Sequence, residues 1–540
     1  MLASFARTLF LFGLLLALLG LGFQHAGVAE VFSDPLTHGR AQDESVYANS
    51  ALGIATTGGW LTPKFMGRLM LFKPPLLVWM AALSLKLLGT SPFALRLPVL
   101  LVGASATLLL LYWSAKAHSL WTAAAAGLLL VADPAWHTFS RLCYTDMLVT
   151  AAVTAAIFTL WRDPQLMRWR SIIAFALSVS AGLMAKSVAG LMPIPVFLLF
   201  CAFTRRRPSS GFWKSLALIF LVSAPWHLYQ AFVHRLWFWS DYVQTQLLGF
   251  GLEPPLRPEG AIPFYFKRLI STDPVLCLLV FTALPALLTA VRARKVEAAV
   301  LLSWLVLVAA SLAAFQFRNF PYLLQLIPPL CLVASGYSPL LSAERRRIVV
   351  PVLGVLLCVK VMFGAPAWAI SYAAPPPLPS AEALRWYGGL ARSNELIAVN
   401  TDDEFSASVM PVRKIHYAFI DPTNVTLRAA PYYGYLGITL SVAEFDRLHD
   451  LEPVFRKRLL DWGLDSGEPI ATAIVAKSAE EVVDMVSTHP RSDFYLPAGL
   501  RARTEGRFQT THRLVLLASG RLFLLSLDSA QSKFRKPALE

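Results

Sequence analysis

The chain has few charged side chains, and this scarcity excludes an ordinary soluble protein. Only 15% of its 540 residues are charged and 56% are hydrophobic, whereas soluble domains carry roughly 25% charged residues. Uncharged apolar stretches long enough to cross a hydrocarbon core of about 30 Å recur from the N-terminus to about residue 372. The composition therefore predicts a polytopic membrane protein.

Cysteine is also scarce, which excludes a disulfide framework and a cysteine-based metal site. The five cysteines have no paired spacing, and the polar region after residue 372 has none. They are Cys143, Cys201, Cys277, Cys331 and Cys358. The net charge of +15 would suit nucleic acid, but many basic residues lie in short turns between apolar stretches. Membrane topology explains that pattern better, so no nucleic-acid partner is expected.

Hydropathy predicts eleven membrane spans. They lie at about residues 6–24, 97–115, 118–138, 147–161, 171–185, 187–204, 214–233, 269–291, 298–317, 320–341 and 348–371. The first stretch follows Arg7 and lacks a small-x-small cleavage site, so we interpret it as a retained anchor rather than a signal peptide.

Basic residues gather in alternate connections, which the positive-inside rule assigns to the cytoplasm. These connections hold Lys116, then Arg162, Arg168 and Arg170, then Arg205, Arg206 and Arg207, then Arg292, Arg294 and Lys295, then Arg345, Arg346 and Arg347. The N-terminus is then cytoplasmic and the C-terminal region lies outside. Residues 25–96 form a long first outer loop, in which Pro75–Gly89 predicts a short amphipathic helix lying flat at the interface.

The domain organisation follows from this topology. We predict a transmembrane domain over 1–372, a Pro-rich linker over 373–379 and a soluble extracytoplasmic α/β domain over 380–540. Helix-like and strand-like segments alternate in the last of these. The helices are expected at Ser380–Arg392 and Ala479–Thr488, and the strands at Leu396–Asn400, Ile470–Lys477, Arg513–Ala518 and Arg521–Leu527.

The outer connections hold isolated ionisable residues, which are costly at a membrane boundary and favour a functional interpretation. A helix that begins near Asp43 sets Asp43 and Tyr47 on one face, with Glu44 beside them. A carboxylate there can orient or deprotonate an acceptor nucleophile. The alternative is an acidic cap on a surface helix.

Single cations lie at three further outer boundaries, where each suits a phosphate group. Lys73 precedes a proline pair, Lys186 separates two apolar spans, and Arg318 follows another span. Taken alone, Lys73 is better explained as a lysine that snorkels to lipid phosphates. Arg141 and Asp146 share one connection, where they are either site residues or a local ion pair.

His227 and His234 lie among aromatic residues that indicate an interfacial belt. Neither histidine has a ligand-like partner in the sequence, so no metal site is assigned, although use of a divalent metal stays open. We expect no other cofactor.

The ordered motifs resemble those of one known family. "DES.Y", "GW.TP", "KPPL..W", "FALRLP", "R...TDM", "K...GL", "PW.LY" and "R...PYLLQLIPPL" follow one another between about residues 30 and 340. This series closely resembles the polyprenyl-phosphate-sugar-dependent glycosyltransferases, which include the protein O-mannosyltransferases and the bacterial aminoarabinose transferases of lipid A. The resemblance implies the GT-C fold and transfer of a sugar from a lipid-phosphate carrier to an extracytoplasmic acceptor, usually with inversion.

The resemblance also implies roles for individual residues. Asp43 and Asp146 match the catalytic aspartates of the first and second loops, and Lys73 matches the lysine that meets the carrier phosphate. Tyr47, Lys186 and Arg318 match a tyrosine and two cations of the family. We expect the remaining substrate contacts to come from Glu44, Arg141 and His227. Phe72 departs from the pattern, since the family commonly has an acid before the lysine.

The predicted function is therefore a membrane glycosyltransferase that transfers a hexose or pentose, in a bacterial inner membrane. Its partners would be a polyprenyl-phosphate-linked sugar, membrane lipids and an acceptor that is lipid A, another glycolipid, a glycan or a protein. A lipid or polysaccharide transporter or flippase is the alternative, and a non-catalytic scaffold is a second. A transporter would need ionisable residues at mid-bilayer, whereas here they lie mostly at span ends.

Overall fold

A computed structural model describes most of the chain. The described residues are 42–65, 68–239, 242–243, 260–315, 318–363, 415–419, 474–475, 478–518 and 520–528, with several residues between 383 and 399. The predicted first span, at 6–24, and the predicted linker, at 373–379, lie outside them.

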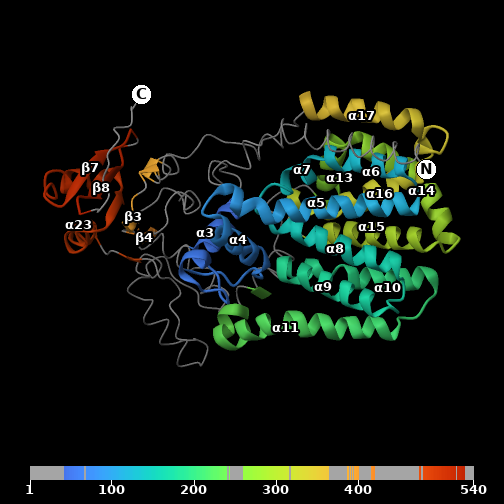
Figure 1. Cartoon of the computed structure of the whole chain (residues 1–540), viewed down its shortest axis with the longest axis horizontal. Coiled ribbons are helices and arrows are strands. Elements are labelled where there is room, and N and C mark those ends of the chain that lie inside the picture. Colours follow the sequence, from blue (N-terminus) through green and yellow to red (C-terminus); the bar gives the residue numbers. More distant parts are fainter. Residues whose placement is uncertain are drawn as a thin grey trace.

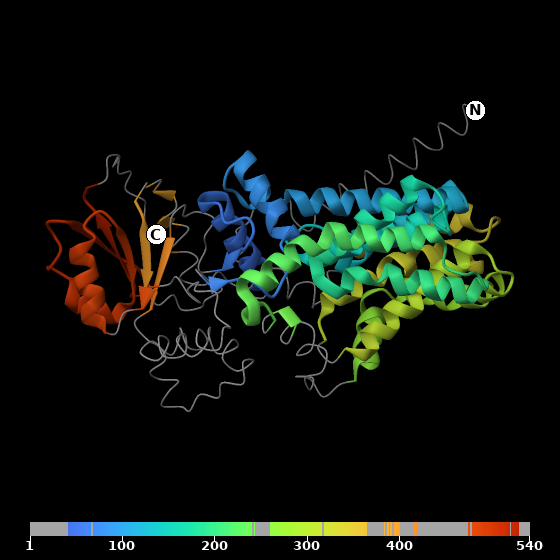
Figure 2. The same cartoon turned by 90° about the horizontal axis from the view of Figure 1, so that it is seen from below.

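Most of the described chain is helical, as the hydropathy predicted. The helices pack side by side into one bundle (Figures 1 and 2). They are α5 (Pro92–Ala117), α6 (Leu120–Ala132), α7 (Pro134–Phe139), α8 (Thr145–Arg162), α9 (Trp169–Lys186), α10 (Pro193–Thr204), α11 (Ser210–Phe238), α13 (Ala261–Thr272), α14 (Pro274–Arg292), α15 (Val296–Ala314), α16 (Ile327–Tyr337) and α17 (Arg346–Phe363). The short 3₁₀ helices η2 (Ser187–Leu191), η4 (Phe320–Gln325) and η5 (Pro339–Leu341) connect some of them.

Among the residues that the structure describes, six helical segments are long and apolar enough to cross a membrane. They are Pro92–Ala117, Trp169–Leu191, Ser210–His234, Pro274–Arg292, Val296–Ala314 and Phe320–Tyr337. Each has a mean hydropathy between 1.3 and 2.3 over its best window. The chain is therefore a multi-pass membrane protein, and the finer count of eleven spans stays a prediction.

Several of the predicted spans are not continuous α-helices, and 187–204 already divides into η2 and α10. The segment 118–138 breaks at Asp133, whose carboxylate accepts a hydrogen bond of 2.7 Å from the Trp136 amide and caps α7. The segment 269–291 breaks at Asp273, ahead of α14, and 320–341 begins as the 3₁₀ helix η4. Each new element has proline in its first turn, where the missing N–H costs nothing and the preceding helix cannot continue.

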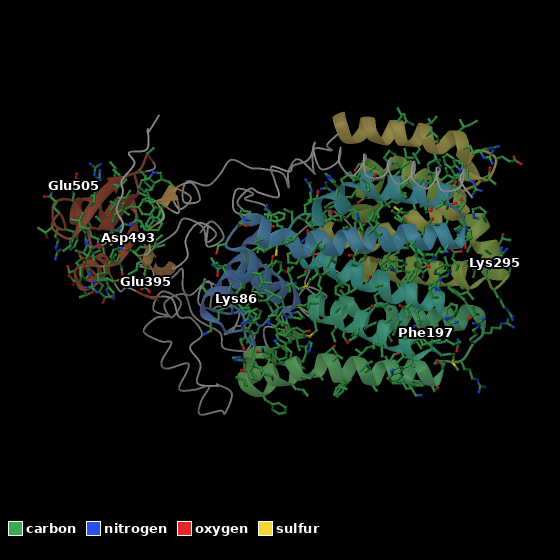
Figure 3. All side chains as sticks on the ribbon, in the orientation of Figure 1. Lys86, Phe197, Lys295, Glu395, Asp493 and Glu505 are labelled. Atoms are coloured by element: carbon green, nitrogen blue, oxygen red, sulfur yellow. The ribbon has the colours of Figure 1, made fainter. Side chains whose placement is uncertain are left out.

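Two helices lie at one end of the bundle, as the sequence predicted. The helix α3 (Gln42–Thr57) begins next to Asp43, and α4 (Leu76–Leu88) fills the predicted amphipathic segment between Pro75 and Gly89. A short hairpin of β1 (Lys64–Phe65) and β2 (Arg68–Leu69) joins them. Figure 3 places Lys86 of α4 at this end and Lys295 at the opposite end. Because Lys295 lies in a predicted cytoplasmic turn, the α3–α4 end corresponds to the predicted outer face.

The C-terminal region contains a six-stranded mixed sheet in the order β5-β4-β3-β6-β8-β7. Its strands are β3 (Leu396–Val399), β4 (Ile415–Phe419), β5 (Ile474–Val475), β6 (Asp493–Leu496), β7 (His512–Leu516) and β8 (Leu522–Ser526). The amphipathic helix α23 (Ala479–Thr488) buries Val482, Val483 and Val486 in a core with β6 and β8. The strands β4 and β6 were not predicted from the sequence.

Candidate active site

An ion pair joins the first turn of α8 to the last residue of α9. Lys186 Nζ donates a hydrogen bond to Asp146 Oδ1, and the side chains are only 14% and 7% exposed. The N-terminal end of a helix favours a carboxylate and the C-terminal end favours a cation. The pair therefore has support from both helices, and Asp146 pairs with a distant lysine instead of forming a purely local loop contact.

The turn after Lys186 holds this lysine at the bundle surface. Ser187 has φ of 53°, in the left-handed region, and ends α9. The following 3₁₀ helix folds back so closely that a Cβ on Gly190 would lie 2.0 Å from the carbonyl carbon of Gly182. Only glycine fits at Gly190, which explains the "K...GL" spacing in terms of backbone approach.

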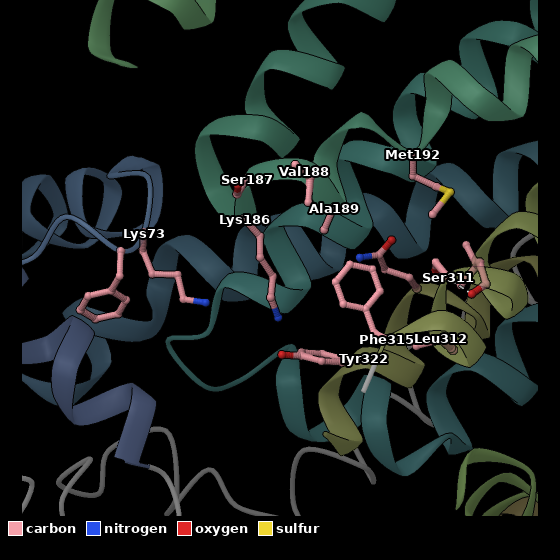
Figure 4. Close-up of a pocket in the computed structure, with 13 residues that line it drawn as sticks. Lys73, Lys186, Ser187, Val188, Ala189, Met192, Ser311, Leu312, Phe315 and Tyr322 are labelled. Carbon is pink, nitrogen blue, oxygen red and sulfur yellow. Dashed lines mark hydrogen bonds between the residues drawn. The ribbon is translucent and has the colours of Figure 1, made fainter. Parts of the chain in front are cut away.

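Lys73 and Lys186 line one pocket of about 180 Å³. Figure 4 shows both ammonium groups reaching into the space between α4, α9 and the Tyr322 ring. The remaining wall is mainly apolar and comes from η2, α15, the residue that follows each of them, and η4. It includes Val188, Ala189, Met192, Val308, Leu312 and Phe315, with Ser311 and Gln325 as polar members. The pocket thus has a cationic side and a hydrocarbon-like side.

Two tyrosines lie beside predicted cations of the site, Tyr322 at Lys186 and Tyr265 at Arg318, and neither was singled out from the sequence. Lys186 Nζ lies 4.5 Å from the centre of the Tyr322 ring, within cation–π range. Tyr265 accepts a hydrogen bond of 3.3 Å from the Asn319 amide, next to half-buried Arg318. Burial raises the pKa of Tyr265 to about 12, so its hydroxyl stays protonated and can donate.

Glu44 is fully buried, in contrast to the exposure expected of a substrate contact. Its carboxylate receives hydrogen bonds of 2.8 and 2.9 Å from Arg96 and one of 2.7 Å from the Cys143 amide. This contact fastens the first turn of α3 to α5 and to the connection before Asp146. Asp43 precedes Glu44, so the backbone positions of the two predicted catalytic aspartates are close; the Asp43 side chain lies outside the described atoms.

Tyr47 and Arg141 are also buried. Tyr47 is 2% exposed and its ring meets Tyr144 edge to face, with centres 6.4 Å apart. Arg141 is 4% exposed and its Nε donates to the His137 carbonyl at 2.9 Å. Both residues flank the connection that carries Asp146, which favours a positioning role over direct substrate contact.

His227 lies on α11 and is bound by protein groups at both ring nitrogens. Nδ1 lies 2.8 Å from the Ser223 carbonyl, so it carries the proton, and Nε2 then accepts from the Tyr242 hydroxyl at 2.8 Å. Trp226 and Gln230 on the same helix donate to the Leu61 carbonyl at 2.9 and 2.7 Å. The "GW.TP" segment therefore packs on α11 through Trp226 and Gln230, and His227 packs against the Trp226 ring.

Within the described residues, no three His, Cys, Asp or Glu side chains gather as a metal-binding group. The chemistry of the lysine pocket instead suits an anion attached to a hydrocarbon. Two ammonium groups can hold a phosphate and stabilise the negative charge that it gains on leaving. The apolar wall can take the first part of a lipid chain. These features lie in a multi-pass helical bundle, and they define a membrane protein with a site for an anionic lipid.

Comparison with solved structures supports this fold. The chain superposes on the crystal structure of ArnT from Cupriavidus metallidurans bound to undecaprenyl phosphate with a TM-score of 0.65 and 15% identity, over 96% of this chain and 98% of that one. The apo structure of the same protein gives a TM-score of 0.62.

Sequence comparison confirms the predicted resemblance to the lipid-phosphate-sugar-dependent glycosyltransferases. Residues 72–229 match the family described as dolichyl-phosphate-mannose-protein mannosyltransferase. The chain is 26% identical over 326 residues to an undecaprenyl phosphate-alpha-4-amino-4-deoxy-L-arabinose arabinosyl transferase of Aeromonas salmonicida, covering 56% of this chain and 57% of the relative. An uncharacterized protein of Aquifex aeolicus is 26% identical over 55% of this chain and 58% of its own length. The chain thus aligns with less than two thirds of these relatives.

Proposed function

We propose that this protein is a membrane glycosyltransferase that moves a sugar from a polyprenyl-phosphate carrier to an acceptor outside the cytoplasm. The observation that carries the proposal is the pocket in which Lys73 and Lys186 face an apolar wall. A lipid-linked phosphate has the same two parts, an anion and a hydrocarbon chain. By analogy with the relatives named above, the carrier is undecaprenyl phosphate.

The reaction is a single displacement at the sugar carbon that bears the phosphate. The acceptor oxygen forms a bond to this carbon while the bond to the phosphate oxygen breaks, which inverts the configuration. Asp43 takes the proton of the acceptor hydroxyl as general base or orients it. The phosphate leaves with the bonding electrons and one additional negative charge, which Lys73 and Lys186 stabilise.

The surrounding residues act in supporting roles. Asp146 holds Lys186 in position, and Tyr322 covers the same ammonium group. Arg318 supplies a third positive charge near the phosphate. Glu44 acts through its contacts with Arg96 and Cys143 and fixes the start of α3. Tyr47, Arg141 and His227 stabilise the outer connections around the site.

The placement in the membrane is part of the same proposal. Eleven spans with a cytoplasmic N-terminus put the site and the C-terminal α/β domain, residues 380–540, on the extracytoplasmic side of a bacterial inner membrane. In Figures 1 and 2 the C-terminal strands lie beyond the α3–α4 end of the bundle, which supports this arrangement. The transferred sugar is a hexose or pentose, and the acceptor is lipid A, another glycolipid, a glycan or a protein.

The direct test is release of undecaprenyl phosphate from a labelled undecaprenyl-phosphate sugar by the full-length protein in liposomes. Wild-type protein should release the carrier phosphate, and Lys73→Gln should slow release about 10²–10³-fold. Lys267→Gln, at an exposed lysine on α13, is the matched control and should keep full activity. Movement of intact donor across the liposome without cleavage would favour a flippase and sink the proposal.

The sugar and acceptor can be identified together. Comparative mass spectrometry of lipids and glycans from a deletion strain should show one modification missing, which the wild-type gene restores. The same strain carrying Lys73→Gln should stay unmodified. Activity is expected to survive chelation by EDTA, since the proposed reaction uses side chains of the chain itself.

A further inference from the structure

A second and larger hollow lies on the side of the bundle formed by α4, α5 and α8. Its volume is about 580 Å³, and among the described residues it shares no lining member with the lysine pocket. One face of α4 forms one wall of the hollow, through Met80, Leu83, Ser84, Leu87 and Leu88. Several of these side chains are exposed, Leu87 to 72%, so the hollow opens toward the surrounding lipid.

The length of this groove matches one leaflet of a bilayer. Its lining on α5 runs from Leu97 to Leu109, which at 1.5 Å per residue is about 18 Å. Half of a hydrocarbon core of about 30 Å is about 15 Å. Ala151 and Ala155 on α8 form a floor of small side chains, so a hydrocarbon chain can lie between the helices. An acyl chain of one leaflet fits this length, whereas a polyprenyl tail is far longer.

The helix α4 contributes two polar groups near the groove, the Ser84 hydroxyl and the Lys86 ammonium. The Ser84 hydroxyl is buried and has no hydrogen-bond partner within the described part of the chain, although Ser84 lines the groove. Buried hydroxyls are normally hydrogen-bonded, so a bound group with an acceptor oxygen would satisfy it. Lys86 is exposed in the last turn of α4, next to Leu87. A lysine at that depth attracts lipid phosphates.

We propose that the groove is a binding site for an anionic phospholipid. One acyl chain occupies the groove, an ester carbonyl accepts from the Ser84 hydroxyl, and the phosphate binds Lys86. The site is separate from the proposed chemistry, because thirteen positions along the chain, most of them in α4, separate Lys86 from Lys73, about 20 Å at helical rise. The lipid is therefore a ligand that packs α4 against α5 and α8 and steadies the segment that carries Lys73.

Native mass spectrometry of the full-length protein in mild detergent tests occupancy. Wild-type protein should retain one anionic phospholipid. Ala151→Phe fills the floor of the groove and should lose it, while Leu108→Phe, at an exposed position of α5 outside the groove, should retain it. Equal retention by Ala151→Phe, or a retained glycolipid or polyprenyl lipid in place of the phospholipid, would overturn the proposal.

Thermal unfolding tests recognition of the headgroup without relying on a core substitution. Phosphatidylglycerol should raise the Tm of wild-type protein more than phosphatidylcholine of the same chains does. Lys86→Gln should remove this difference, and Lys267→Gln should leave it unchanged. Equal effects of the two lipids on wild-type protein would contradict the proposal, whatever the outcome of the transfer assay.

Discussion

Lys186 and Asp146 lie 40 residues apart in the chain and form a partly buried ion pair between the end of α9 and the start of α8. The pair brings a predicted phosphate-binding cation and a predicted catalytic carboxylate into direct contact. Lys186 also contacts the Tyr322 ring and lines the pocket of Lys73. Through Asp146 on one side and Tyr322 on the other, Lys186 links the start of α8 to η4.

The first prediction concerns the coupling of this pair. Lys186→Gln should lower kcat for carrier release about 10²–10³-fold, because it removes a charge that stabilises the leaving phosphate. Asp146→Asn should cost less, because Lys186 keeps its charge but loses its anchor. In a double-mutant cycle the effects should be strongly non-additive. Additive losses would show that Asp146 acts independently of Lys186.

The second prediction concerns Asp43. Asp43→Asn should lower transfer at least about 10²-fold, since the amide cannot accept the acceptor proton. The variant should still insert into the membrane and bind undecaprenyl phosphate as wild type does. Membrane fractionation and a binding titration are the controls. A fully active Asp43→Asn protein would remove this residue from the mechanism.

A third prediction concerns the stability of the buried Glu44–Arg96 pair. Both side chains are fully buried, so Arg96→Met leaves an uncompensated carboxylate and should destabilise the protein by about 3–5 kcal/mol. Replacing both residues with apolar ones should recover part of this loss. The exposed pair Arg501–Glu505 is the matched control, and breaking it should cost less than about 1 kcal/mol. Unfolding in detergent, followed by fluorescence, gives the comparison.

The fourth prediction is a pH dependence of the C-terminal sheet. Burial lowers the pKa of His512, whose Nε2 lies 3.0 Å from the Ser492 carbonyl. Below the unfolded pKa of about 6.5, His512 takes up a proton in the unfolded chain but stays neutral in the folded sheet. The free energy of unfolding therefore decreases as the pH is lowered from about 6.5 to the folded pKa of His512. His512→Phe should flatten this dependence below about pH 6.5. An unchanged pH profile in the variant would assign the effect to other groups.

Much of the fold could be predicted because it depends on local pattern. Hydropathy located the helices of the bundle, and the alternation of basic turns gave a topology. The bounds of α23 matched those expected at Ala479–Thr488, because Ser478 caps the helix and its valines repeat at helical spacing. The strands β4 and β6 were missed, since each has four or five residues and becomes a strand through pairing with distant segments.

The site was predictable only in part. Single charges at span ends pointed to Lys73, Asp146 and Lys186, because charge is costly there. The sequence could not show that Glu44 turns inward to Arg96, 52 residues away, or that the Tyr322 ring covers Lys186. Tyr265 and Tyr322 resemble ordinary aromatic residues of apolar segments, and only their contacts distinguish them.

The most direct test of the account is an experimental structure of the full-length protein with undecaprenyl phosphate. The phosphate should lie between the ammonium groups of Lys73 and Lys186, with the first isoprene units along Leu312 and Phe315. Binding of the phosphate elsewhere on the bundle, with both lysines uninvolved, would contradict the account.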